Sequence, residues 1–286
     1  MEWHYSAAMG IGVVGSTVIH LSQGLMKLGV ARKQQGAPPG AYRRPYRAGL
    51  LLNLSAPVWV IGANGFAPTV FYTSMYAVGL IPLLIFSCRV LGHHLRKRDI
   101  FGAILLAVGA GMLGLGEWLG GATPMSMVGH RPILICAALW LVAAPLIGFW
   151  SQRQKRLKVG LILGALGGGF LSLDALLKGL AQADGTASAF LPETSYGILL
   201  FVASFVGAIA AFLMTQWAHR RQAPPAETLA GYDAAYVALP ALLVPAAAGQ
   251  SGVNPVCLLG LAVIGVGLFL LTRKSVSGFS PGQPLA

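Results

Sequence analysis

Long apolar stretches constrain the fold of this 286-residue chain more than any other feature of its sequence. Several of them run for roughly 18 to 24 residues with few charged side chains, the length that an α-helix needs to cross a hydrocarbon core of roughly 30 Å. Charged residues make up only 10% of the chain, too few to cover the surface of a soluble domain of this length. The sequence therefore predicts an all-α, polytopic membrane protein whose outer surface faces lipid.

The apolar stretches predict nine transmembrane helices. The predicted spans are about 6–30, 48–67, 69–91, 99–117, 132–150, 159–182, 195–218, 229–248 and 254–272. The N-terminus lacks the basic segment of a cleavable signal peptide, and the first apolar stretch is long enough to span. The tail over 275–286 is rich in Ser, Gly and Pro, and we expect it to be disordered.

The basic residues predict the orientation of these helices. Seventeen of the 20 lysines and arginines follow odd-numbered spans and so lie on one side of the membrane, including those in a predicted loop at 31–47. Only Arg131 lies on the other side, and Lys27 and Lys178 lie within spans. The positive-inside rule makes the basic side cytoplasmic. We therefore expect an inner (plasma) membrane protein with a periplasmic N-terminus, a cytoplasmic C-terminus and no nucleic-acid partner, although its net charge is +12.

The two halves of the sequence resemble each other. Gln23 and Lys27 in the first span match Asp174 and Lys178 in the sixth span at an offset of 151 residues. The third and fourth spans match the eighth and ninth at an offset of 158, without a gap. The matched pairs at this offset are Pro82 with Pro240, Gly102 with Gly260, and Gly109 with Gly267.

The loops within the matched halves differ in charge. The residues 93–98 are basic, whereas the corresponding residues 251–256 are neutral. An inverted pair of repeats predicts this difference, because one loop then lies inside and the other outside. We therefore expect a 4 + 1 + 4 arrangement, in which 1–131 forms the first repeat, 132–158 a linker helix with a basic loop, and 159–274 the second repeat.

Several short motifs are similar to those of a known superfamily. They are Gln23-x-x-x-Lys27, Asn64-Gly-Phe-Ala-Pro68, the basic turn after the third span, and the Gly-rich fourth span from Gly102 to Gly116. With these motifs the chain resembles the drug/metabolite transporter superfamily, in its EamA/NIPA-like, magnesium-transporter-like branch. The resemblance implies a carrier of nine or ten helices with a central cavity lined by the first, third, sixth and eighth spans.

One departure from the family pattern bears on the substrate. Related families often end the third span with an acidic residue, where this chain has His93 and His94, and the second and third spans contain no acidic residue. Because Mg²⁺ prefers carboxylate ligands and retained waters, this departure argues against magnesium.

Polar residues inside the spans are the candidates for a binding site, because they are costly in lipid and are usually functional. Tyrosine pairs four residues apart in the third and eighth spans could form an aromatic wall around a solute. The candidate substrate-binding residues are His20, Gln23, Tyr72, Tyr76, Asp174, Lys178, Asp233 and Tyr236.

Each candidate also has a structural interpretation. His20 could be an interior residue with satisfied hydrogen bonds, or it could exchange a coupling proton, as could Asp174. Asp174 and Lys178 could form only an ion pair, since they lie four residues apart on one helix face. The tyrosines could belong to an interfacial belt. Lys27 lies near the cytoplasmic end of its span, where we expect it to snorkel toward the surface.

These observations predict a secondary transporter that moves a small solute by alternating access. The solute would be an organic metabolite, with anionic ones among the candidates because of the nearby lysines. We expect no enzyme chemistry, no cofactor and no metal site, because the sequence has no catalytic motif and no metal-ligand spacing. The expected partners are the small-molecule solute and the lipid bilayer, and a homodimer is left open. The alternatives are a divalent-cation carrier of NIPA type and a non-transporting membrane subunit or lipid-binding scaffold.

Overall fold

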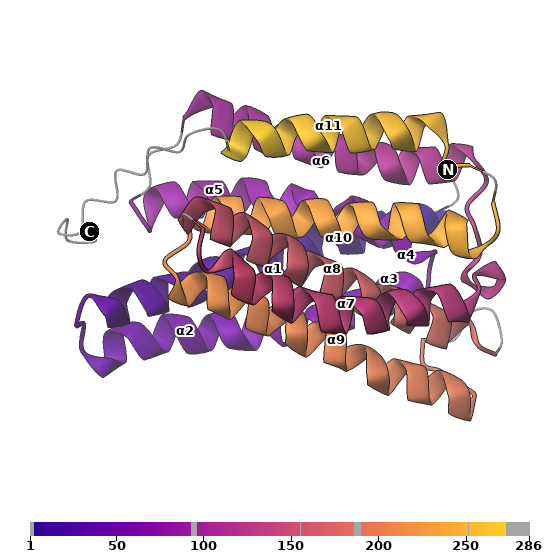
Figure 1. Ribbon diagram of the computed structural model, residues 1–286, viewed down its shortest axis with the longest axis horizontal. Helices are drawn as coiled ribbons and strands as arrows, with labels where there is room; N and C mark the ends of the chain where they lie inside the picture. The colour runs from indigo at the N-terminus through magenta and orange to yellow at the C-terminus, as the bar shows by residue number, and fades with distance from the viewer. Residues whose placement is uncertain (1–2, 93–95, 155, 186–189, 251, 273–286) are drawn as a thin grey trace.

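The computed structural model describes residues 3–92, 96–154, 156–185, 190–250 and 252–272. Within these ranges all regular secondary structure is helical, which confirms the all-α prediction, and most helices run along the long axis of the molecule (Figure 1). The predicted disordered tail, His93 and His94 lie outside the described residues. The helices are α1 (Trp3–Gln34), α2 (Pro39–Asn53), α3 (Ala56–Asn64), α4 (Thr69–Ser74), η1 (Tyr76–Gly79), α5 (Leu80–Arg89), α6 (Lys97–Leu119), η2 (Met125–Met127), α7 (His130–Ser151), α8 (Arg156–Ala183), α9 (Ser195–Arg220), α10 (Pro225–Ala247) and α11 (Pro255–Thr272).

Several of these helices are long and apolar, as expected of a polytopic membrane protein. Among the described residues, eight helical segments have the length and composition to cross a membrane. They are α1, the run from Thr69 to Arg89, α6, α7, α8, α9, α10 and α11. The predicted second span, 48–67, has no single helix of that length.

The segment predicted as the second span forms two shorter helices. α2 ends at Asn53 and α3 begins at Ala56. Pro57 explains this break, because it has no N–H to donate and its ring would clash with the carbonyl of Asn53 in a continuous helix. At the break, Ser55 Oγ donates to the Leu52 carbonyl at 2.7 Å and accepts from Trp59 Nε1 at 3.0 Å. The side-chain polar groups of Ser55 and Trp59 are therefore hydrogen-bonded at the break between the two helices.

The predicted loop at 31–47 is mostly helical, which corrects the prediction. α1 continues to Gln34 and α2 already begins at Pro39, so only 35–38 connect them. Proline is favoured in the first turn of a helix, where its missing N–H would have had no partner. The adjacent prolines and glycine at 38–40 therefore begin a helix rather than extend a loop.

The segments predicted as the third and eighth spans are built differently. The predicted third span consists of α4, the 3-10 helix η1 and α5, whereas the predicted eighth span is the continuous helix α10. The 3-10 turn of η1 comes just before Pro82, which cannot donate a hydrogen bond to the preceding turn. Pro240 and Pro245, by contrast, lie inside α10 without interrupting it.

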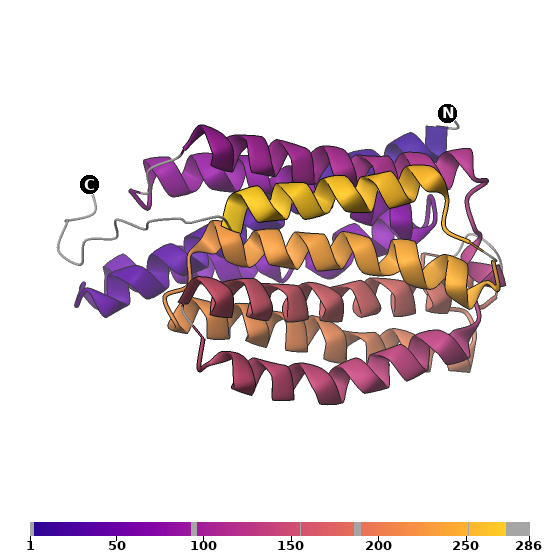
Figure 2. The same ribbon diagram turned by 45° about the horizontal axis from the view of Figure 1, so that its top comes forward.

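α6 and α11 form a close antiparallel pair that both views show side by side (Figures 1 and 2). A Cβ added to Gly109 would lie 2.8 Å from the Gly260 carbonyl oxygen, and one added to Gly260 would lie 2.8 Å from the Gly109 carbonyl oxygen. Gly102 and Gly267 make a second contact of the same reciprocal kind. Two similar elements make such reciprocal contacts when a two-fold axis relates them.

The helices differ greatly in burial. The apolar part of α8 is 83% buried inside the protein, whereas that of α7 is only 17% buried. α8 packs between α9 and α10, and α7 lies along one edge of the bundle (Figure 2). Most of the polar residues of α8 are therefore removed from both lipid and water.

Candidate functional site

All eight candidate residues are buried in the protein interior, with at most 5% of any of them exposed. They come from α1, α4, η1, α8 and α10. The structure divides them into a His20–Asp233 pair, a cluster of tyrosines, an Asp174–Lys178 pair, and Gln23, which lies apart. The tyrosines are interior residues, so they do not form an interfacial belt.

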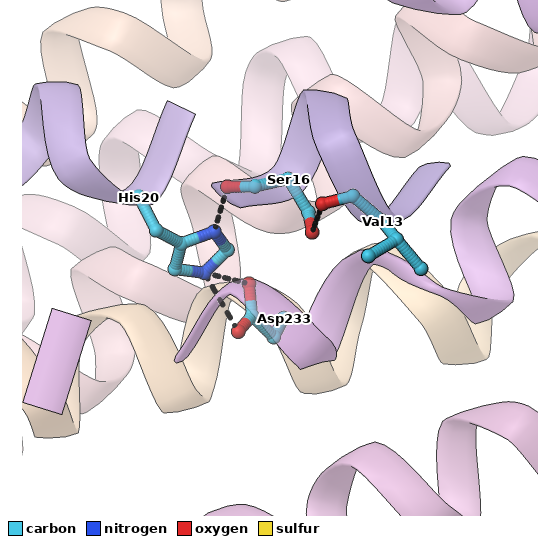
Figure 3. Close-up of polar contacts among 4 residues, drawn as sticks. All are labelled: Val13, Ser16, His20 and Asp233. Carbon is cyan, nitrogen blue, oxygen red and sulfur yellow. Dashed lines mark hydrogen bonds and ion pairs between the residues drawn. The ribbon is translucent and has the colours of Figure 1, made fainter. Parts of the chain in front are cut away.

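The first group joins α1 to α10 (Figure 3). His20 Nε2 lies 3.0 and 3.1 Å from the two carboxylate oxygens of Asp233. His20 Nδ1 lies 2.8 Å from the backbone carbonyl oxygen of Ser16, one turn earlier in α1. The imidazole is thus held between a carbonyl of its own helix and a carboxylate of the facing helix.

These contacts fix how protons are distributed in the pair. A carbonyl oxygen can only accept, so His20 Nδ1 must donate to Ser16. The contact to Asp233 then requires one further proton, which either His20 Nε2 or the Asp233 carboxyl can carry. Without that proton, the lone pair of Nε2 would face a carboxylate, and the contact would become repulsive. While Nδ1 donates to Ser16, the α1–α10 contact is attractive only if the pair holds this proton, because a neutral imidazole has a single N–H and cannot donate to both partners.

Gly79 allows α1 to approach η1 closely enough to orient His20. A Cβ at this position would lie 2.4 Å from His20 Nδ1 and 2.6 Å from the Ser16 carbonyl oxygen. Any larger residue at position 79 would thus occupy the space in which His20 Nδ1 and the Ser16 carbonyl oxygen form their hydrogen bond. The 3-10 turn before Pro82 places this glycine against α1.

The tyrosines pack around the His20–Asp233 pair. The Tyr76 ring centroid lies 5.2 Å from that of His20 and 4.5 Å from that of Tyr236. Tyr72 lies 6.1 Å from Tyr76, and Tyr232 lies 6.3 Å from both Tyr76 and Tyr236. The Tyr236 hydroxyl is buried and has no hydrogen-bond partner among the described residues. The cluster therefore contains a polar group that a solute or a water could satisfy.

The second charged pair lies within α8. Lys178 Nζ donates to Asp174 Oδ1 one turn earlier, and it also lies 4.3 Å from the centroid of the Phe205 ring in α9. α8 packs closely on α10, the helix that carries Asp233 and Tyr236. The second pair therefore lies on a helix that adjoins the first.

Gln23 belongs to a separate group near the predicted cytoplasmic end. Its Oε1 lies 3.3 Å from His219 Nε2 in α9. Lys27 was expected to snorkel, but it is only 8% exposed, and its Nζ donates to the backbone carbonyls of Ala223 at 3.1 Å and His219 at 3.4 Å. Cations are favoured at a helix C-terminus, where carbonyls are unpaired. His219 was not among the residues predicted from the sequence, although the polar residues Thr215, Gln216 and His219 end an otherwise apolar span.

Two cavities lie at one end of the bundle, and none of the eight candidates lines either of them. The larger, about 300 Å³, is lined by residues 4, 5, 64–68, 122, 124–126, 179, 182, 183 and 185, and we call it the outer vestibule. The smaller, about 170 Å³, lies between the ends of α6 and α10 and the start of α11, beside Glu117. The candidates instead pack against one another in the protein interior.

Comparisons with known proteins leave the family assignment as a prediction. No family model matches the chain, and no solved structure matches it. The chain is 28% identical over 174 residues to an uncharacterized protein of Corynebacterium glutamicum, an alignment that covers 54% of this chain. The chain thus spans 59% of the length of that relative.

Proposed function

We propose that the protein is a secondary carrier that moves a small solute across the inner membrane by alternating access, coupled to a proton held by His20 and Asp233. In this proposal nine spans form two inverted repeats of four helices with α7 as the linker, and the divided segment α2–α3 is the second span. The observation that carries the proposal is the buried contact between α1, from one repeat, and α10, from the other.

Two features support the inverted repeats. The glycines that the sequence matches at an offset of 158 are the ones that meet reciprocally between α6 and α11. In addition, His20 of the first pair lies on α1 and both members of the second pair lie on α8, and these are the matching first helices of the two repeats in this proposal. Carriers built from inverted repeats bind solutes between the repeats and rock one repeat against the other.

The proposed orientation is supported by contacts between loops. These loops follow odd-numbered spans, and the proposal puts all of them on the same side of the membrane. Gln34 and Gln222 are in contact, as are Arg221 and Gln152, so the basic connections after α1, α7 and α9 gather at one end. We assign this end to the cytoplasm by the positive-inside rule. The outer vestibule then faces the periplasm.

Coupling follows from the single proton of the His20–Asp233 pair. With the proton present, α1 and α10 attract each other through a charge-assisted hydrogen bond. After its loss, the neutral imidazole has a single N–H and cannot donate to both Ser16 and Asp233, so the contact between the two repeats becomes weaker at this point. A proton bound from one side and released to the other would therefore link proton movement to rocking.

The test begins by identifying a solute. A thermal-shift screen of the purified protein against metabolites and divalent cations selects compounds that raise its melting temperature. Uptake of a selected compound into proteoliposomes is then measured with and without an imposed pH gradient. We expect His20→Gln to retain exchange at equal concentrations, because glutamine can hydrogen-bond, but to lose gradient-driven accumulation at least tenfold, because it cannot carry the proton.

His130→Gln is the matched control, since His130 lies at the start of α7 and its ring stacks on Tyr196. It should accumulate the solute like the wild type. Normal accumulation by a folded His20→Gln variant would exclude proton coupling through this pair. Uptake of a divalent cation would favour the NIPA-type alternative, and a folded protein that takes up no compound would favour a membrane subunit or lipid-binding scaffold.

A further inference from the structure

The smaller cavity, which we call the Glu117 cavity, is framed by hydrogen bonds between the end of α6 and the start of α11. Asn254 lines the cavity, and its Nδ2 donates to the Gly116 carbonyl at 3.0 Å. Gln250 and Thr123 line it as well, and Gln250 Nε2 donates to the Thr123 hydroxyl oxygen at 2.9 Å. These bonds join the loop that follows α6 to the loop that follows α10, so the walls of the cavity are held in place.

Glu117 supplies the cavity with a carboxylate. The residue is only 8% exposed, and its Oε1 accepts from the backbone N–H of Thr123 at 2.9 Å, which fixes the orientation of the carboxylate. Its Oε2 has no hydrogen-bond partner among the described residues, and it is not one of the unpaired atoms that the protein encloses completely, as the Tyr236 hydroxyl is. This oxygen is therefore accessible to a ligand in the cavity.

The surroundings of Glu117 are electrostatically negative. Glu117 lies in the last turn of α6, where the unpaired backbone carbonyls carry partial negative charge and where the helix has no basic residue. The described lining of the cavity contains no Lys, Arg or His, and the ion pairs among the described residues do not include Glu117. A mostly buried carboxylate without an opposite charge is unfavourable. A positively charged ligand in this cavity would therefore be stabilised.

The charge and size of the cavity limit which cation fits. Glu117 is the only Asp or Glu in the described lining, so a single positive charge balances it. Ca²⁺, by contrast, takes roughly 6–8 oxygen ligands, several of them commonly carboxylates. The cavity volume of about 170 Å³ lies below the range of about 300–1,000 Å³ that is usual for pockets that bind larger organic ligands. The cavity thus suits a small cation with one charge.

We infer that the Glu117 cavity binds a small monovalent cation, either an inorganic ion or a primary ammonium group. The cation would contact Glu117 Oε2, and the Thr123 hydroxyl and the Gln250 amide supply neutral oxygens to the same lining. Neither His20 nor Asp233 lines this cavity, so the inference does not depend on the proposed proton coupling.

Titration of the wild-type protein with small cations tests the inference without any substitution. The melting temperature of the purified protein in nanodiscs is followed while sodium, potassium or methylammonium chloride replaces choline chloride at constant ionic strength. Choline has the same charge, but its bulky ammonium group has no N–H and cannot approach a carboxylate closely. We expect a saturable rise in melting temperature with at least one small cation, because a ligand that binds only the folded state stabilises it. A rise with sodium or potassium would identify an inorganic ion, and a rise with methylammonium alone would identify an ammonium ligand.

Glu117→Gln locates the site. Glutamine has nearly the same size as glutamate and can still accept from the Thr123 N–H, so the variant should fold, but it carries no charge. We expect it to weaken cation binding at least tenfold. Glu193→Gln is the matched control, because Glu193 is exposed in the connection between α8 and α9 and does not line the cavity. It should bind the cation like the wild type. Glu117→Asp keeps the charge and should keep a saturable response.

Three outcomes would overturn the inference: no saturable response of the wild type to any of the three cations, an unchanged response in Glu117→Gln, or tighter binding of calcium than of every monovalent cation. Solute uptake does not enter these measurements. A protein that binds the cation through Glu117 but accumulates no solute would refute the carrier and leave the cation site intact. Proton-driven uptake by a protein without the cation response would refute the cation site alone.

Discussion

The two buried charged pairs have similar chemistry, but one joins two helices and the other lies within a single helix. His20 and Asp233 belong to different helices, α1 and α10, and their contact ends if those helices separate. Asp174 and Lys178 lie one turn apart in α8, so the pair moves as a unit with its helix. Rocking of one half can therefore break the first pair but not the second. Only a competing ligand or a local rearrangement of side chains can break the second pair.

Because of this difference, the two pairs would have different roles in a carrier. The pair between helices suits coupling, because its attraction depends on one proton and on the distance between two helices. The pair within α8 suits contact with a solute, because a polar group of the solute can replace either partner while the helix stays in place. These roles can be tested separately by substitutions that remove one member of a pair and keep the other.

The largest loss of stability is expected from Asp174→Leu. It leaves the Lys178 ammonium buried without its carboxylate, and breaking such a pair typically lowers the free energy of unfolding by about 3–5 kcal/mol. Asp233→Leu should cost less, about 1–3 kcal/mol, because His20 can lose its proton and keep its bond to Ser16. Reversible unfolding of both variants in micelles would measure the difference. Equal losses would contradict the distinction between the pairs.

The double variant Asp174→Leu with Lys178→Leu is the control for this prediction. Replacing both members of a buried pair by apolar residues is often nearly neutral, so most of the stability should return. We expect uptake of an identified solute to fall more than tenfold even so, because Asp174 would be a working residue. Wild-type uptake by the folded double variant would leave the pair with a structural role alone.

The sequence could predict which residues are buried together but not how they pair. The Asp174–Lys178 contact was foreseeable, since a separation of four residues places both on one face of a helix. The partner of His20 was not, because Asp233 lies 213 positions away and only the packing of α1 on α10 brings them together. The outer vestibule was missed for the same reason, since four separate segments bound it.

The positions at which helices are interrupted also could not be predicted from the sequence. Hydropathy identified the long apolar helices, but it does not register backbone hydrogen bonds, so the break before Pro57 and the 3-10 turn before Pro82 were not located. Pro57 and Pro82 lie at such interruptions, whereas Pro240 and Pro245 lie in a continuous helix, because the surrounding packing decides whether a proline interrupts a helix.

A smaller effect is expected from Gly79→Ala, which tests how His20 is oriented. The added methyl group would overlap His20 Nδ1 and the backbone of Ser16, and overpacking of this kind typically costs about 1–3 kcal/mol. Gly62→Ala in α3 is the matched control, because a Cβ there meets no other atom within 4 Å. Unfolding measurements should show a loss only for Gly79→Ala. Equal stability of the two variants would mean that α1 and η1 are not tightly packed at this point.

The smallest effect is expected from Lys27→Met, at the other contact between α1 and the second half. The Lys27 ammonium donates to two carbonyls at the end of α9, but one of them, on His219, also accepts from the Gln222 backbone N–H at 3.0 Å. Removing the ammonium thus leaves mainly the Ala223 carbonyl without its donor, and a cation at a helix C-terminus typically contributes about 0.3–1 kcal/mol. We expect a loss of stability in that range.

Lys158→Met at the exposed start of α8 is the control for this change and should leave the free energy of unfolding unaltered. A weak contact at Lys27 is what the carrier proposal requires, because α1 and α9 must separate at the cytoplasmic end when the solute is released there. A loss of about 3 kcal/mol or more, the size found for broken buried ion pairs, would instead make Lys27 a fixed anchor between the halves. Rocking would then have to occur about some other contact, and the His20–Asp233 pair alone could not control it.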